Sequence, residues 1–253
     1  MNNYNLYIIG GYVRDKILGI KSKDIDYAFE FTPENGAEEM ADWAPEACYN
    51  RMNAILTGEG FEIFLETPSC FTTRARFPKG HEYGGTTADF VMCRKEEYLD
   101  PESRIPTVSM GNLYDDLYRR DFTMNAIAIG LDGEYIDPFG GIEDIAKRII
   151  RCPKDAEKSF SEDYLRMLRA IRFSITKGFE MDSDIFYALQ KREYWDNMKN
   201  HVSLERIREE IYKCMKHDTI RTIRLLSDLE EECGNILNSI FKDGLWLKPT
   251  NEK

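Results

Sequence analysis

Up to about residue 151, apolar and polar positions alternate in short runs that are separated by turn residues. Runs of this kind, rich in β-branched and aromatic residues, are typical of strands in a partly buried sheet. The pattern predicts five strands, at residues 6–9, 24–31, 61–65, 88–93 and 126–129. It also predicts a helix over 12–18, which a glycine pair opens and Gly19 ends, and a second helix over 38–43.

After Cys152 and Pro153, apolar positions recur with the spacing of helices. Ser159 is followed three residues later by Glu162, a capping-box spacing that predicts the start of a helix. Further helices are expected at 183–192, 203–216 and 218–232. The chain is therefore predicted to be an α+β protein, with one domain at residues 1–151 and a helical domain at residues 152–253.

One segment of the first domain, residues 70–87, has a basic centre followed by a proline and several glycines. We interpret it as an exposed hairpin tip or loop. Arg74, Arg76 and Lys79 are candidate contacts to RNA phosphates there. A solvated hairpin without a ligand is the alternative.

Composition narrows the class of protein. With 42% apolar and 31% charged residues among 253, the chain is typical of a globular protein with a real core. No apolar run approaches the roughly 18 residues of a membrane span, and the N-terminus lacks the pattern of a signal peptide. The six cysteines show no CxxC spacing, so we expect reduced thiols in a cytoplasmic protein and no zinc site. A net charge of −11 does not by itself indicate binding to nucleic acid.

Two carboxylates share one face of the predicted strand at 24–31. Its apolar residues point to one side, and Asp24 and Asp26 point to the other. Two like charges roughly 6–7 Å apart repel each other, and a divalent cation between them removes the repulsion. Oxygen ligands favour Mg²⁺, and Asp89 on another apolar run could complete such a site. The alternative is that both aspartates lie on the solvated face of an edge strand.

A glycine pair precedes these aspartates. Gly10 and Gly11 allow a tight turn at a helix start, where free N–H groups and the helix dipole favour a phosphate. Considered alone, the pair is explained as well by an ordinary strand-to-helix turn. Together with Arg14 and the aspartate pair, it favours a site that handles phosphates.

At this point a family resemblance becomes visible in ordered motifs. The stretches "GGYVRDKILG", "KDIDYA", "RRDFTMNAIAI", "IDPFGG" and "SEDYLRMLRAIRF" resemble the successive motifs of class II CCA-adding enzymes. These are tRNA nucleotidyltransferases of the polymerase-β superfamily, and bacterial poly(A) polymerases share the motifs. The resemblance runs from about Tyr7 to Phe173.

The resemblance implies a fold and a chemistry. The fold is a polymerase-β-like head with a mixed sheet and helices, followed by a shortened all-helical domain. Asp24 and Asp26 correspond to the metal-binding catalytic pair, with Asp89 at the position of the third catalytic carboxylate. Such enzymes use Mg²⁺ to transfer nucleotides from CTP and ATP to the 3′ end of tRNA.

The motif "RRDFTMNA" supplies arginines and an amide. Arginine forks suit phosphates, and an Asn amide suits a ribose hydroxyl or a phosphate. A surface ion pair between Arg120 and Asp121 is the alternative, with Asn125 inside a strand-like run. In the family this motif lines the nucleotide pocket, so the resemblance implies a set of nucleotide-binding residues: Gly10, Gly11, Arg14, Arg120, Asp121 and Asn125.

The helix predicted after Ser159 places Asp163 and Arg166 three residues apart, on one face that Arg169 continues. A helix salt bridge is the plainer interpretation. The other comes from hydrogen bonding, because cytosine and adenine both present an amino donor beside a ring-nitrogen acceptor. An Asp that accepts and an Arg that donates match these two bases and mismatch uracil and guanine. In the family, ED-x-x-R has this role, which implies that Asp163, Arg166 and Arg169 bind the nucleotide.

Two further segments bear on the product and on RNA binding. Residues 94–108 match the flexible loop of the family, with Arg104 as a candidate lever on the pocket, which favours complete CCA addition. The stretch "SLERIREEIYKCMKH" resembles the neck helix, and the tail that grips tRNA in the family is expected to be truncated.

Three functions are compatible with these residues. The first is CCA addition to tRNA. The second is a poly(A) polymerase, or a terminal transferase that acts on another RNA. The third is a catalytically idle RNA-binding module, against which the intact set of Asp24, Asp26 and Asp89 counts. The pattern predicts no membrane partner and does not indicate an oligomeric state.

Overall fold

A computed structural model of the chain describes residues 4–22, 24–32, 44–97 and 107–241. The chain divides into two compact units, residues 1–146 and 147–253. All six cysteines lie in the described ranges and are free thiols. None of the described helices is both long enough and apolar enough to cross a bilayer.

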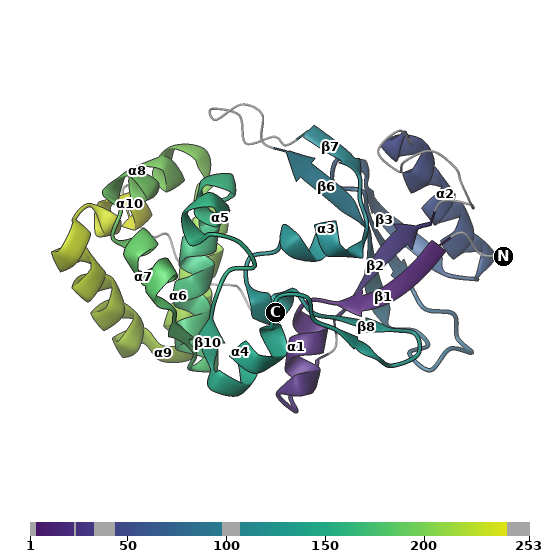
Figure 1. Ribbon diagram of the computed structural model, residues 1–253, viewed down its shortest axis with the longest axis horizontal. Coiled ribbons are helices and arrows are strands. Elements are labelled where there is room, and N and C mark those ends of the chain that lie inside the picture. The colour runs from purple at the N-terminus through teal and green to yellow at the C-terminus, as the bar shows by residue number, and fades with distance from the viewer. Residues whose placement is uncertain (1–3, 23, 33–43, 98–106, 242–253) are drawn as a thin grey trace, which may run out of the picture. The chain divides into compact units, whose positions relative to one another are not determined.

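The first unit is built on a mixed sheet (Figure 1). Within the described residues its strand order is β3-β4-β5-β2-β1-β8-β9. The strands are β1 (Tyr4–Ile9), β2 (Ile25–Phe31), β3 (Glu62–Thr67), β4 (Thr72–Arg76), β5 (Thr87–Met92), β8 (Ala128–Gly130) and β9 (Tyr135–Ile136). β2 and β5 run parallel, and the other neighbours are antiparallel. The expected α+β head with a mixed sheet is confirmed.

Helices and short turns complete this unit. They are α1 (Gly11–Ile17), α2 (Pro45–Gly58), η2 (Pro68–Cys70), α3 (Leu113–Tyr118), η3 (Thr123–Asn125) and α4 (Gly141–Lys147). β6 (Arg94–Glu97) and β7 (Thr107–Met110) form a separate antiparallel hairpin. The helix predicted at 38–43 lies outside the described residues. α2 was not predicted from the sequence, and it begins with Pro45 in its first turn.

The two faces of β2 follow from its alternating sequence. The apolar side, Ile25, Tyr27, Phe29 and Phe31, is buried in a core that α2 covers with Cys48, Tyr49, Met52 and Leu56. On the opposite side, Ala28 joins a second core with Leu113 and Leu117 of α3. Asp24 and Asp26 lie on that second side, at the start of the strand. Asp24 is exposed, whereas Asp26 is partly buried and pairs with Ile9 of that second core.

The expectation that 70–87 is an exposed hairpin tip or loop is wrong for its first half. Thr72–Arg76 forms β4, which is paired on both sides, with β3 and with β5. Thr73 and Ala75 are buried, while Arg74 and Arg76 are exposed on the other face. This short alternation is a strand signal, and the basic residues within it obscured the signal.

The second unit is helical. Its helices are α5 (Ala156–Glu162), α6 (Leu165–Lys177), α7 (Ser183–Leu189), α8 (Arg192–His201), α9 (Leu204–Cys233) and α10 (Ile236–Phe241). A two-residue parallel pairing of β10 (Ile149–Ile150) with β11 (Glu180–Met181) accompanies them. α6 packs along α9, and both bury apolar faces (Figure 1). The predicted break between helices near residue 217 is present, because Asp218 has non-helical angles inside α9.

The predicted helix start at Ser159 is wrong. Ser159 is buried inside α5, and the N-cap of that helix is Asp155, whose side chain accepts from the N–H of Lys158. The chain then leaves the helix at Asp163 (φ −148°, ψ 100°) before α6 begins at Leu165. Periodicity alone did not show this break, because it lasts only two residues.

Candidate active site

Three aspartates of the first unit line one pocket. Asp26 on β2 is the register partner of Asp89 on the parallel strand β5, and Asp24 lies two residues before Asp26. The pocket has a volume of about 270 Å³. Its lining residues come from β2, β4 and β5 and the turns beside them: Asp24, Ile25, Asp26, Arg74, Thr87, Ala88 and Asp89. The sheet therefore brings together carboxylates that are far apart in the sequence.

The electrostatic environment of this pocket disfavours the ionised form of Asp26. Burial raises the pKa of Asp26, and the nearby carboxylates of Asp89 and Asp24 raise it further. The positive charges of Arg120 and Arg74 act in the opposite direction without cancelling the rise. A buried carboxylate among like charges is stabilised by any cation that reaches it.

Arg74 was considered only as a contact to RNA, and it belongs to this pocket. Its Nε donates to Oδ1 of Asp89 and its Nη2 donates to Oδ2, each at 2.6 Å. Both residues lie on the same rung of β4 and β5. The hydrogen bonds and the charge of Asp89 raise the pKa of Arg74, and Asp24 and Asp26 add to this effect.

The pocket suits Mg²⁺, because its three acidic side chains offer carboxylate oxygens as metal ligands. In the part of the chain that the structure describes, no three His, Cys, Asp or Glu side chains converge closely enough to form a metal-binding group. One carboxylate, Asp89, has both of its oxygens engaged by Arg74.

The glycine pair sits beside the aspartates. Gly10 has φ +73°, a conformation that favours glycine, and precedes α1. A Cβ atom at Gly10 would lie 3.1 Å from the guanidinium of Arg120 and 3.3 Å from the carboxylate of Asp26. A side chain at this position would therefore crowd two of the predicted site residues.

Three of the predicted nucleotide-binding residues are hydrogen-bonded to one another. Arg14 on α1 is buried, and its Nη1 donates to the amide oxygen of Asn125 at 2.6 Å. The Nδ2 of Asn125 donates to Oδ1 of Asp121 at 3.0 Å. Asn125 lies in the η3 turn and not in a strand, so that part of the expectation is wrong. The turn points the amide at both partners.

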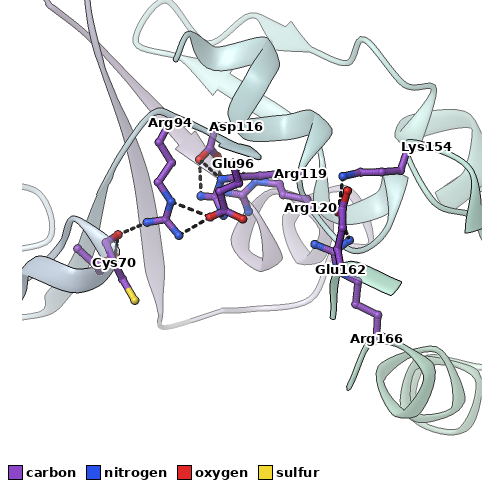
Figure 2. A network of polar contacts seen from close by, with 10 residues as sticks. Cys70, Arg94, Glu96, Asp116, Arg119, Arg120, Lys154, Glu162 and Arg166 are labelled. Carbon is purple, nitrogen blue, oxygen red and sulfur yellow. Dashed lines mark hydrogen bonds and ion pairs between the residues drawn. The ribbon is translucent and has the colours of Figure 1, made fainter. Parts of the chain in front are cut away.

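Asp116, which was not predicted from the sequence, is a fully buried residue of α3 that pairs with two arginines (Figure 2). Its Oδ1 accepts from Arg119 at 2.5 Å, and its Oδ2 accepts from Arg120 at 2.9 Å. Burial alone would raise the pKa of Asp116, but the two guanidinium groups outweigh burial and lower it. The ion-pair partner of Arg120 is thus Asp116, and the expected alternative, a surface pair with Asp121, is wrong. The spacing of Asp116 to the arginines, three and four residues on one helix, was the available signal.

Arg119 connects this cluster to the β6–β7 hairpin. Glu96 on β6 accepts from Arg94 at 2.8 Å and lies 3.5 Å from a guanidinium nitrogen of Arg119 (Figure 2). Arg94 also donates to the carbonyl of Cys70. The greater part of the predicted flexible loop, including Arg104, lies outside the described residues.

In the second unit, Asp163 and Arg166 have separate partners. Oδ2 of Asp163 accepts from Arg206 of α9 at 3.1 Å, and its Oδ1 accepts from the N–H of Leu165. Because Asp163 lies at the break between α5 and α6, the expectation that it shares a helix face with Arg166 is wrong. The alternative of a salt bridge between Asp163 and Arg166 is also wrong, since the carboxylate pairs with Arg206.

Arg166 is buried on α6 and is held from α5. Its Nη1 donates to the carbonyl and the hydroxyl of Ser159, at 3.1 and 2.9 Å, and to Glu162 at 3.3 Å. Lys154 contacts the same Glu162 oxygen at 2.5 Å (Figure 2). Arg169, one turn further along α6, lies over the ring of Phe173, 5.8 Å from its centroid.

Comparison with known proteins places this chain in a family. A family model described as the poly A polymerase head domain matches residues 6–151, which is more than half of the chain. The chain belongs to this family.

Relatives with similar sequences and structures are CCA-adding enzymes. The CCA-adding enzyme of Geobacillus stearothermophilus is 36% identical over 218 residues, which cover 85% of this chain and 46% of that protein. The crystal structure of the Bacillus stearothermophilus CCA-adding enzyme in complex with CTP is similar, with a TM-score of 0.68 and 30% identity, over 92% of this chain and 49% of that one. A tRNA nucleotidyltransferase complexed with a primer tRNA and an incoming ATP analog has a TM-score of 0.66 and 26% identity, over 94% and 60%. The chain thus spans about half the length of the curated relatives that it matches.

Proposed function

We propose that this protein is a tRNA nucleotidyltransferase, which adds C, C and A to the 3′ end of tRNA from CTP and ATP and releases pyrophosphate. The observation that carries the proposal is the pocket lined by Asp24, Asp26 and Asp89. Membership in the poly A polymerase head domain family and similarity to CCA-adding enzymes support it.

Asp24 and Asp26 are the proposed Mg²⁺ ligands, and Asp89 is the third catalytic carboxylate. When bound, the ions supply Lewis acidity, which favours deprotonation of the attacking 3′-hydroxyl and neutralises charge on the phosphates. The raised pKa of Asp26 supports this assignment, because a cation relieves the repulsion among the three carboxylates. Asp24 lies just before β2 and is exposed, so the pocket that it lines is open to solvent on this side.

We assign binding of the nucleotide's phosphates and ribose to the residues around α1. Gly10 and Gly11 allow the backbone to approach a phosphate without a side chain in between. Arg120 brings positive charge next to Asp26, and Asp116 fixes the direction of its guanidinium. Asn125 is held by its bonds to Arg14 and Asp121, so these three residues present one preorganised polar surface.

The base is assigned to the second unit. Asp163 accepts from the exocyclic amino group of cytosine or adenine, and Arg166 donates to the adjacent ring nitrogen; Arg169 is the third residue assigned to the nucleotide. The bonds of Arg206 to Asp163, and of Ser159 and Glu162 to Arg166, limit the directions in which the pair can point. A fixed polarity rejects uracil and guanine, because each presents a carbonyl beside an N–H.

The proposal is tested by single-nucleotide incorporation. Purified protein, Mg²⁺ and a tRNA transcript that ends before CCA are mixed with each of the four nucleoside triphosphates in turn. We expect incorporation of C and none of U or G. The Asp24→Ala variant, once circular dichroism has verified that it is folded, should incorporate none of the four nucleotides. Absence of incorporation by the wild-type protein would favour an RNA-binding module, and long runs of A would favour a poly(A) polymerase.

A further inference from the structure

A positively charged side chain, that of Arg74, lines the carboxylate pocket beside the three aspartates. Arg74 comes from β4, and its cross-strand partner Asp89 comes from β5. Because Asp26 is the register partner of Asp89 on the other side of β5, the three residues form one row across the sheet, in the order Arg74, Asp89, Asp26. Side chains on one rung of neighbouring strands point to the same face.

The contact between Arg74 and Asp89 is bidentate but not deeply buried. Both carboxylate oxygens of Asp89 accept at 2.6 Å. The side chain of Arg74 is 48% exposed and that of Asp89 is 25% exposed. Ion pairs with this degree of exposure contribute little to stability, so a stronger cation can replace the guanidinium at little cost. A bidentate arginine fork also fixes the orientation of a carboxylate.

We propose that Arg74 is the resident counter-ion of the carboxylate pocket: it orients Asp89 in the protein without metal and yields oxygens of Asp89 when a divalent cation binds. Arg74 is thus a positioning residue that sets the affinity of the pocket for cations. The proposal rests on the proposed function in taking this pocket as a site for divalent cations.

The same strand supplies a matched control. Arg76 lies two residues further along β4 on the same face, and it pairs with Glu62 of β3 at 2.6 Å. Its side chain is 46% exposed, close to the value for Arg74. Arg76 does not line the carboxylate pocket. Removal of Arg76 therefore changes the net charge and one cross-strand pair as removal of Arg74 does, without changing the pocket.

The test measures binding of Mn²⁺ alone, followed by electron paramagnetic resonance of free Mn²⁺, with the full chain and no nucleotide. Arg74→Ala is expected to bind Mn²⁺ about tenfold more tightly, because a unit positive charge that competes for Asp89 is gone. Arg74→Lys keeps the charge and should stay close to the wild-type affinity. Arg76→Ala should bind Mn²⁺ like the wild type. In an Asp89→Asn background, removal of Arg74 should have a much smaller effect.

A second readout covers stability. Mn²⁺ should raise the Tm of Arg74→Ala by more than it raises the Tm of the wild type, since the variant gains more from the cation. Equal Mn²⁺ affinity of Arg74→Ala and wild type, or weaker binding by the variant, would overturn the proposal. An equal gain in Mn²⁺ affinity in Arg76→Ala would contradict the proposal, because it would show a general effect of surface charge. Absence of Mn²⁺ binding by every form of the protein would also overturn the proposal. If affinity shifts as expected while no nucleotide is transferred, the counter-ion role stands and the proposed transferase activity fails.

Discussion

Asp26 and Asp89 lie directly opposite each other on the parallel strands β2 and β5. Neighbouring strands are about 5 Å apart, so the two carboxylates share one small region of the sheet face. With Asp24 two residues earlier, the fold gathers three acidic groups at one end of β2 and β5.

Asp26→Asn should stabilise the fold while it abolishes nucleotide addition. The raised pKa of Asp26 means that folding disfavours its ionised form, mainly through burial. The neutral variant avoids this penalty at neutral pH, so its Tm in EDTA should exceed that of the wild type. The difference should shrink as the pH falls through the raised pKa of the folded state, and it should vanish only below the ordinary pKa of the unfolded chain, where Asp26 is protonated in both states.

Asp24→Asn is the matched control for that prediction. Asp24 is exposed, so its replacement should leave the Tm nearly unchanged while nucleotide addition is lost as well. Thermal unfolding and incorporation of C are measured on the same preparations. A fall in Tm for Asp26→Asn, or activity close to that of the wild type in either variant, would contradict the assignment.

Asp116→Asn should destabilise the first unit and weaken nucleotide binding. The variant leaves Arg119 and Arg120 without their shared carboxylate, and removal of one partner from a buried ion pair typically costs roughly 3–5 kcal/mol. Because the pKa of Asp116 is lowered in the folded state, its contribution is present at neutral pH and is lost as the pH falls through that pKa. Urea unfolding at pH 7 and at acidic pH measures the loss of stability and its dependence on pH.

The control for this variant is Glu59→Gln, which changes an exposed carboxylate of the same unit. It should unfold at nearly the same urea concentration as the wild type. If Asp116→Asn also unfolds like the wild type, then Asp116 does not hold the arginines in solution, and the preorganisation that we assign to Arg120 is wrong.

Asp163→Ala should relax the choice between cytosine and uracil by roughly 1–3 kcal/mol, the usual cost of an unmet polar partner. Arg166→Ala should relax it too, with a larger loss of rate, because the contact to the ring nitrogen is removed. Arg206→Ala keeps both residues but frees Asp163, so its effect on selectivity should be smaller than that of Asp163→Ala. Single-turnover incorporation of each nucleotide gives the ratios. Unchanged C-over-U and A-over-G ratios in active Asp163→Ala and Arg166→Ala variants would contradict base reading by this pair.

Local pattern was sufficient for part of this structure. Alternation along residues 24–31 predicted which side of β2 is buried, because the side-chain period of a strand is two residues. The helical character of the described residues 156–241 and the break near Asp218 also follow from local periodicity. Asp24 and Asp26 could therefore be assigned to one face from the sequence alone.

Long-range features could not be obtained in this way. The pairing of β2 with β5, which puts Asp89 opposite Asp26, joins strands far apart in the chain, and no local pattern specifies that register. Arg74 was predicted only as a contact to RNA phosphates and not as part of the carboxylate pocket, because its segment was interpreted as an exposed hairpin tip or loop, although β4 is paired on both sides. Asp163 was placed on a helix because a break of two residues hardly disturbs an apolar period.

The most direct test of the central claim is the sequence of the product. A tRNA transcript without CCA is incubated with the protein, Mg²⁺, CTP and ATP, and the 3′ ends are sequenced. We predict that CTP alone gives two added C residues, that both nucleotides together give CCA, and that synthesis then stops. Tails of A without a defined end, or 3′ ends unchanged from those produced by Asp24→Asn, would contradict the account.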